Sequence, residues 1–142
     1  MALIHLVYVS RRTSALTAQE LKRIVAQSTR RNRAREITGV LLCCGEHVMQ
    51  LLEGEESVVD ATFERIRNDA RHQDVQLLLR KTVRKRLFPE SRMALAELNR
   101  RFRLDRGRLM RLVDYVRTSE QTSLHTVETR MLLSDFYQQL NA

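Results

Sequence analysis

The sequence has very little of several residues on which functional sites often depend. Its 142 residues include four glycines, one proline, two cysteines and no tryptophan, and aromatic residues make up 5%. Four scattered glycines cannot form a glycine-rich phosphate loop, and GxGxxG, P-loop and HExxH motifs are all missing. Cys43 and Cys44 are neighbours, so their side chains point to opposite faces of a strand and cannot form an ordinary disulfide. Without suitably spaced histidines they also make a poor zinc site, and we expect no bound metal.

Length and overall composition are typical of one globular domain. Hydrophobic residues make up 43% of the chain and charged residues 30%. A domain of this size buries roughly two-thirds of the surface that its unfolded chain exposes, so it needs no disulfide or metal to fold. The sequence has no apolar run long enough to cross a bilayer, and its first ten residues do not resemble a signal peptide. We therefore expect a cytoplasmic protein without a membrane partner.

The chain is strongly basic, with a net charge of +8. Arginine-rich faces exposed to water explain this charge most simply, and a nucleic-acid surface is the alternative. Because no aromatic residues are interleaved to stack on bases, nucleic acid is the less favoured partner. The basic residues gather in three segments, at 30–35, 80–86 and 100–111.

The pattern of apolar residues predicts an α+β fold with a ferredoxin-like, five-stranded mixed sheet and two helices on one face. Thr17 and Glu20 form a capping box that starts a helix reaching about Arg31, and Ser57 is expected to start the second helix, which ends at 69–72. Gly45-Glu46 joins two apolar runs into a β-hairpin. The expected strands cover residues 3–9, 37–44, 47–54, 75–83 and 91–97.

After residue 97 the pattern becomes helical. Apolar stripes on two predicted helices begin near Leu109 and Leu124. We therefore divide the chain into a sheet domain, 1–98, and a two-helix extension, 99–142, which packs on the open face of the sheet or at an oligomer interface. The stripes favour a homo-oligomer, although packing within one chain would bury them equally well. No segment after Glu97 is long enough for a cyclase or phosphodiesterase, so we expect no enzyme activity.

Gln50 is the residue that fits its surroundings least. It lies in the middle of an apolar strand, where an unpaired amide group costs about 1 to 3 kcal/mol, so it needs hydrogen-bonding partners. Tyr8 is a second polar residue in an apolar strand. A planar heterocycle between the helices would have apolar walls from Ile24 and Ile66. Its edge would meet polar groups on the same helices, at Ser28, Asn32, Arg65 and Asp69.

At these positions the sequence resembles the BLUF domains, which are blue-light sensors that use flavin. The resemblance covers about the first hundred residues at near-constant spacing. Besides Ile24 and Ser28, the matching segments are LVYVS around Tyr8, Asn32 followed by ITG, MQLLEG around Gln50, ERIRNDARH from Glu64 to His72, and RLFPESRM ending at Met93.

The resemblance implies a non-covalent flavin between the two helices, usually FAD, with FMN or riboflavin as alternatives. Asn32 would bond the C4 carbonyl of the ring, with Gln50 near N5. Arg65 would donate to the C2 carbonyl and Asp69 would accept from N3–H. The implied cofactor-binding residues are Ile24, Ser28, Arg31, Asn32, Gln50, Arg65, Ile66, Asp69 and His72, and the implied photoactive residues are Tyr8, Gln50 and Met93.

The resemblance also implies a mechanism. Tyr8 hydrogen-bonds Gln50 and gives an electron and then a proton to the excited flavin. The Gln50 amide is left rotated or tautomerised, and absorption moves to the red. The strand bearing Met93 and the C-terminal helices pass the change to an unknown protein partner.

Three positions depart from the family pattern. Ser91 stands where many members have a tryptophan, Arg31 replaces a second asparagine, and Glu36 replaces a glycine. The alternative function is therefore a degenerate scaffold or interaction module without photochemistry.

Overall fold

The computed structural model describes residues 2–13, 18–44, 47–89 and 92–97, and the structural statements below concern these residues. Two helices and five strands are found in this part of the chain. In order they are β1 (Leu3–Arg12), α1 (Ala18–Ala34), β2 (Thr38–Cys44), β3 (His47–Glu55), α2 (Glu56–Arg67), β4 (His72–Val83) and β5 (Arg92–Glu97).

The strands form one sheet in the order β4-β1-β3-β2-β5. Neighbours among the first four strands are antiparallel, and β5 runs parallel to β2. The two helices and the antiparallel sheet confirm the predicted α+β architecture. β1 and β3 lie in the middle, and their register places Tyr8 opposite Gln50 and His5 opposite Glu53. The two polar residues of each pair therefore meet directly across one strand boundary.

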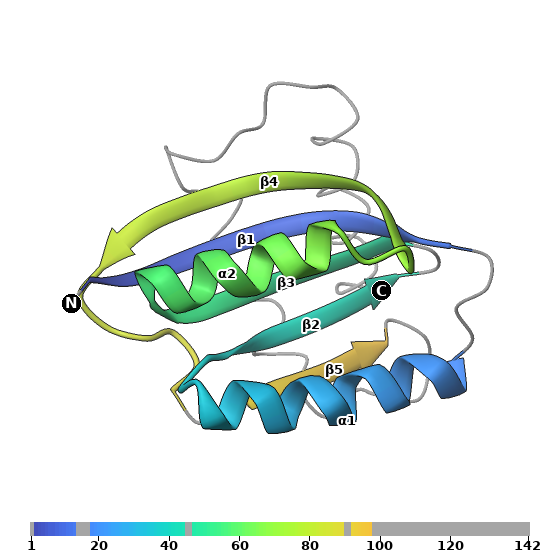
Figure 1. The fold of residues 1–142 in the computed structure, drawn as a ribbon, viewed down its shortest axis with the longest axis horizontal. Helices are drawn as coiled ribbons and strands as arrows, with labels where there is room; N and C mark the ends of the chain where they lie inside the picture. The colour runs from blue at the N-terminus through green and yellow to red at the C-terminus, as the bar shows by residue number, and fades with distance from the viewer. Residues whose placement is uncertain (1, 14–17, 45–46, 90–91, 98–142) are drawn as a thin grey trace, which may run out of the picture.

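Both helices lie on the same face of the sheet (Figure 1). α2 packs over β1 and β3, and α1 lies against β5. Every second residue of β1 points to this face, as expected for a strand. The core on this side is built from β1, β2, β3 and α2, and its buried members are Ile4, Leu6, Tyr8, Ile37, Leu41, Val48, Leu52, Val59 and Phe63.

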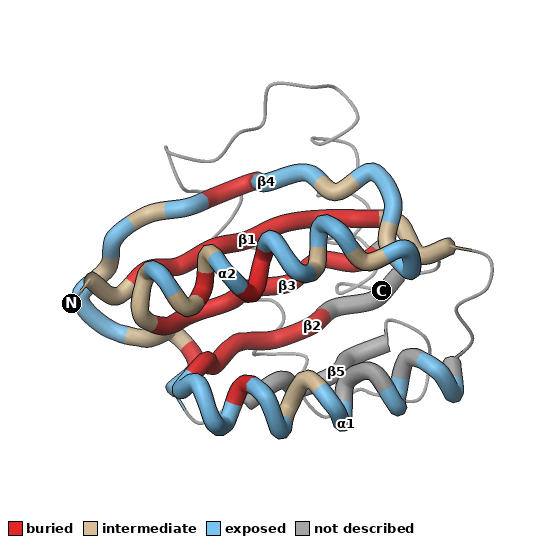
Figure 2. Tube along the Cα trace, in the orientation of Figure 1, coloured by how far each residue is buried: buried red, intermediate tan, exposed pale blue. Residues whose placement is uncertain are grey.

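The middle of β1 is buried on both sides of the sheet, as its continuous apolar run predicts (Figure 2). His5, Val7 and Val9 alternate with the residues of the helix-side core and therefore lie on the far face, where they are also buried. The far face thus has a core of its own, and buried polar residues on it need partners as much as Gln50 does.

The predicted cap of the second helix is wrong by two residues. The N-cap is Glu55, whose carboxylate accepts from the backbone N–H groups of Ser57 and Val58. The Ser57 hydroxyl donates to the Glu55 carboxylate at 2.6 Å, so Ser57 stabilises the N-cap residue but is not itself the N-cap. The helix ends at Arg67, with Asn68 as its C-cap, and it therefore stops before the predicted end at 69–72.

Several predictions fall outside the described residues. These are the Thr17 member of the capping box, the Gly45-Glu46 turn, Ser91, and the two-helix extension 99–142. In the part of the chain that the structure describes, no helix is long and apolar enough to span a membrane.

Candidate functional site

Tyr8 and Gln50 form a buried polar pair at the centre of the sheet. The Tyr8 hydroxyl donates to Gln50 Oε1, and the two residues are 1% and 5% exposed. The Tyr8 ring lies in the helix-side core, 5.4 Å between centroids from the ring of Phe63 on α2. This bond gives the amide oxygen of Gln50 the partner that its buried position requires.

A second pair extends the polar group along β1. Ser10 lies two residues after Tyr8, on the same face, and its Oγ is 2.9 Å from Nδ1 of His72. The His72 ring meets the Tyr8 ring edge-on, with centroids 6.4 Å apart. Burial lowers the pKa of His72, while Asp69 raises it and Arg71 lowers it by smaller amounts, and the net lowering favours the neutral imidazole. Sequence reasoning missed Ser10, although its position two residues after Tyr8 indicated a polar side chain on the same face of the strand.

Asp69 is held in its ionised form by a neighbour that sequence reasoning did not single out. Its ion pair is formed with Arg71, whose Nε and Nη2 donate at 2.9 and 2.5 Å. These hydrogen bonds outweigh partial burial and lower the pKa of Asp69 to about 2. The carboxylate is therefore an acceptor at any physiological pH, as the role implied for it requires.

The predicted arginine positions lie at the surface. Arg65 on α2 and Arg31 on α1 are both exposed. Partial burial lowers the pKa of Arg65, and the nearby charges of Arg35 and Arg31 lower it further. Positive charge from the two helices is therefore concentrated in one region, which favours an anionic group there.

The remaining predicted site residues differ in burial. Asn32 is 3% exposed, and its carbonyl oxygen accepts from Ile37 N–H at 2.8 Å, which fixes the end of α1 to the start of β2. Ser28 is half-buried, and Ile66 is half-buried against the helix-side core. The side chains of Ile24 and Met93 lie outside the described residues.

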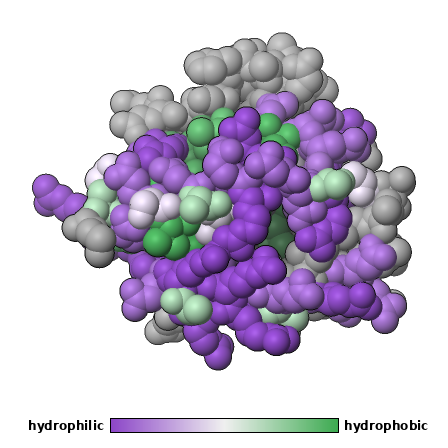
Figure 3. Space-filling model, in the orientation of Figure 1, coloured by the Kyte–Doolittle hydropathy of each residue, from purple (hydrophilic) through white to green (hydrophobic). Residues whose placement is uncertain are grey.

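The polar groups of this face fit the edge of a planar heterocycle. Asn32 and Gln50 carry buried amides, Asp69 offers a carboxylate, and Arg65 offers N–H donors. Figure 3 shows a recess in this face with hydrophobic atoms at its floor and hydrophilic residues around its rim. Within the described residues, no group of His, Cys, Asp and Glu side chains could hold a metal ion.

A second buried polar network lies on the far face of the same two strands. His5 Nε2 is 2.8 Å from Glu53 Oε2, with side chains 4% and 0% exposed. The Glu53 carboxylate also accepts from the backbone N–H groups of Leu87 and Phe88 at 2.5 and 2.8 Å, and from Thr38 Oγ1 at 3.1 Å. Sequence reasoning missed this network, whose signal was a second pair of polar residues within apolar strands.

The Glu53 network makes folding stability depend on pH. Burial alone would raise the pKa of Glu53, but the hydrogen bonds from His5, Leu87 and Phe88 together lower it below 4.5. A carboxylate whose pKa is lower in the folded than in the unfolded chain stabilises the fold at pH values above its pKa in the unfolded chain. It loses that contribution as the pH falls through its pKa in the folded chain.

We expect the urea concentration at the unfolding midpoint to decrease as the pH is lowered from 5 to 3. The decrease should be less steep in Glu53→Gln, whose side chain does not titrate. The control is Glu64→Gln, at an exposed position on α2. Urea unfolding followed by circular dichroism at a series of pH values gives the midpoint of each protein. The same dependence of the midpoint on pH in all three proteins would contradict the role given to Glu53.

Comparison with protein families matches residues 3–94 to the model of the BLUF family, described as sensors of blue light using FAD. Among curated proteins, the chain is 36% identical over 84 residues to the photoactivated adenylate cyclase subunit beta of Euglena gracilis, a match that covers 59% of this chain and 10% of the cyclase. It is 33% identical over 93 residues to the blue light- and temperature-regulated antirepressor BluF of Escherichia coli, a match that covers 66% of this chain and 23% of the antirepressor. The chain thus spans a tenth to a quarter of the length of these relatives.

Solved structures give the same result. The chain resembles the dark-state structure of BlrB, a BLUF protein, with a TM-score of 0.67 and 28% identity, covering 94% of this chain and 97% of that one. It resembles a bacterial light-regulated adenylyl cyclase with a TM-score of 0.70 and 28% identity, covering 94% of this chain and 36% of the cyclase. The family match covers more than half of the sequence, over residues 3–94. This chain therefore belongs to the BLUF family of blue-light sensors.

Proposed function

We propose that the chain is a blue-light receptor that holds FAD non-covalently between α1 and α2 and detects light through Tyr8 and Gln50. The observation that carries the proposal is the buried hydrogen bond from the Tyr8 hydroxyl to Gln50 Oε1. When bound, a flavin supplies the light absorption and accepts an electron in its excited state. Tyr8 supplies that electron and releases its phenolic proton, for which Gln50 Oε1 is the first acceptor.

The burial of the pair explains why the change is reversible. Tyr8 and Gln50 are shielded from water, so the proton has no solvent to escape to and returns to the phenolic oxygen when the electron returns. Gln50 is left with its amide rotated or tautomerised, because its oxygen and nitrogen exchange acceptor and donor roles at nearly the same volume. Its changed hydrogen bonds are the signal, and they shift the absorption of the cofactor to the red.

The cofactor is held by side chains of the two helices in this proposal. Asn32 and Arg65 donate to ring carbonyls, Asp69 accepts from N3–H, and His72 lies at the same end of the site. Ile24, Ser28 and Ile66 line the ring. The concentration of positive charge around Arg31 and Arg65 favours a phosphorylated flavin, FAD or FMN, over riboflavin.

The output in this proposal goes to a protein partner. Met93 lies on β5, which is paired with β2, and β2 is paired with the strand that carries Gln50. A change at Gln50 can therefore reach β5 through two neighbouring strands, and from there the predicted two-helix extension. We propose that this chain signals without an enzyme activity of its own, in the cytoplasm and as a homo-oligomer, in contrast to the relatives named as cyclases.

The test is the visible absorption spectrum of the purified protein, recorded in the dark and after blue light. We expect a flavin spectrum that moves to the red and relaxes in the dark. Reconstitution with FAD, FMN and riboflavin in turn tests the preference for a phosphorylated cofactor. Protein that stays colourless after reconstitution would contradict the proposal and favour the scaffold alternative.

A further inference from the structure

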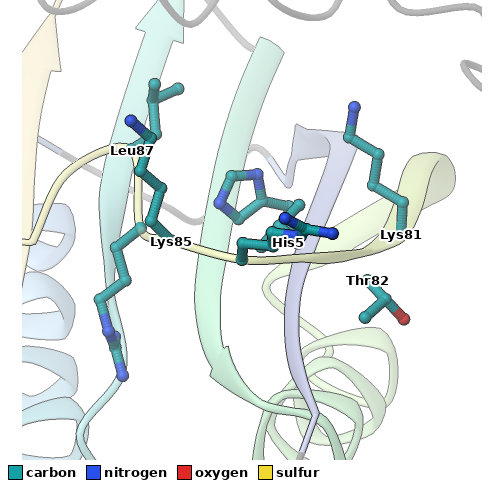
Figure 4. Close-up of a pocket in the computed structure, with 8 residues that line it drawn as sticks. His5, Lys81, Thr82, Lys85 and Leu87 are labelled. Carbon is teal, nitrogen blue, oxygen red and sulfur yellow. The ribbon is translucent and has the colours of Figure 1, made fainter.

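A pocket of about 790 Å³ opens on the far face of the sheet, away from the helices (Figure 4). It lies where β1 begins and β4 ends, and the segment that follows β4 forms one wall. His5 faces it from β1, and Lys81 and Lys85 flank it in Figure 4. The lining residues are His5, Lys81, Thr82, Val83, Arg84, Lys85, Arg86 and Leu87.

The charge of this pocket is unbalanced. Among the residues that the structure describes, its lining includes four lysine and arginine side chains and no carboxylate. Some arginines elsewhere have carboxylate partners, such as Arg80 with Asp60 and Glu56, or Arg11 with Asp74. In the described part of the chain, neither Arg84 nor Lys85 has an ion-pair partner, and both are exposed. Cations that line a concave surface attract an anionic ligand.

The wall of the pocket is fixed to the two central strands. His5 lines the pocket and pairs with Glu53, whose carboxylate binds the backbone of Leu87 and Phe88. Arg86 Nη1 donates to the Glu53 carbonyl at 3.0 Å and to Thr38 Oγ1 at 2.7 Å. The segment that carries Arg84 and Lys85 is therefore held by β1, β2 and β3.

The same strands carry the proposed light-sensing pair. His5 is three residues before Tyr8 on β1, and Glu53 is three residues after Gln50 on β3. Only a short stretch of β3 therefore separates Gln50, whose hydrogen bonds change in the proposed function, from the Glu53 carboxylate that holds the pocket wall. This places the pocket where a binding partner could respond to the state of the pair.

We propose that this pocket is the docking site for an acidic segment of a protein partner, whose carboxylates bind Arg84 and Lys85. Its dependence on light rests on the function proposed above. Charge complementarity selects an acidic partner, and the volume accommodates several side chains. Because the cations are spread along one segment rather than focused on one point, they suit a run of carboxylates better than a single compact anion.

The experiment uses the full chain and an octaglutamate peptide labelled with fluorescein, with binding measured by fluorescence anisotropy at low salt. We expect the double variant Arg84→Glu, Lys85→Glu to weaken binding at least ~10-fold, because like charges then face the peptide. The control is Lys22→Glu, Arg23→Glu, which makes the same change in net charge at exposed positions on α1 and should stay within about twofold of the unchanged protein.

Three results would overturn the proposal. Equal weakening by both double variants would assign the binding to net charge alone. Tripolyphosphate that displaces the peptide and itself binds more tightly would assign the pocket to a small anion. Light scattering that shows a dimer in the unchanged protein and a monomer in Arg84→Glu, Lys85→Glu would assign it to a second copy of the chain.

Absorption spectra of the same samples separate this proposal from the proposed function. The pocket lies on the far face, so Arg84→Glu, Lys85→Glu should keep the red shift of the unchanged protein. A normal red shift without peptide binding would overturn the docking site alone. Peptide binding that depends on Arg84 and Lys85, in protein without any red shift, would overturn the light-sensing function and support the docking site.

Discussion

Replacing Gln50 with leucine is expected to leave flavin binding in place and to abolish the light-induced red shift. Leucine is close to glutamine in size but has no group that can accept a proton or change its hydrogen bonds. Other residues proposed to hold the cofactor, such as Asn32 and Asp69, are unchanged. The variant also leaves the Tyr8 hydroxyl without its acceptor in a buried site, which costs about 1 to 3 kcal/mol.

The measurement is a light-minus-dark difference spectrum of the flavin band. The matched control is Gln27→Leu, the same substitution at an exposed position of α1, which should show the full red shift. A thermal melt of both variants checks that they fold. A Gln50→Leu protein with a normal red shift would refute the proposed role of this amide.

Gly39→Ala is expected to destabilise the fold by about 3 kcal/mol or more. Gly39 has φ 155°, in a region that side chains rarely adopt, and such strain costs about 1 to 3 kcal/mol by itself. A Cβ atom at this position would also overlap the backbone oxygen of Leu51 and lie 2.9 Å from its carbonyl carbon. Because these are backbone atoms of the neighbouring strand, β2 and β3 would have to move apart.

Gly54→Ala is the control for this variant, because it makes the same substitution in the same hairpin. Its Cβ would meet a side-chain atom, Val59 Cγ2, at 3.2 Å, and a methyl group can shift slightly. We expect the free energy of unfolding of Gly54→Ala to stay within about 1 kcal/mol of the unchanged protein. Urea unfolding followed by circular dichroism compares the two, and similar losses would contradict the role given to the close approach at Gly39.

The sequence predicts most of the sheet because the signals there are local. β2 and β3 are two apolar runs beside a short polar turn, and β1 is a continuous apolar run, so their existence follows from the chain itself. The anomaly of Gln50 is likewise visible from its neighbours. That Tyr8 lies opposite it depends on the register of two strands far apart in the sequence, and only the family resemblance implied that pairing before the structure placed it.

Other contacts could not be predicted because they depend on competition between similar residues. Glu55 and Ser57 are both able to cap α2, and the carboxylate of Glu55 reaches two N–H groups at once. Arg65 is the helical neighbour of Asp69, but Arg71 beyond the helix end reaches both carboxylate oxygens. Helical periodicity does not describe the turn in which Arg71 lies, so this partner appears only in three dimensions.

The alignment of the two polar pairs along β1 and β3 limits how this sheet can change. A slip of β3 by one residue would place Gln50 opposite Val7 or Val9, and Glu53 opposite Ile4 or Leu6. Since such a slip also moves every side chain to the other face, it would break both pairs and expose both cores at the same moment. Each pair therefore stabilises the strand register in which the other pair forms. Sliding of one central strand past the other is therefore too costly to carry a signal, and any change that starts at Gln50 has to travel by rotation of side chains and by movement of the segments attached to them.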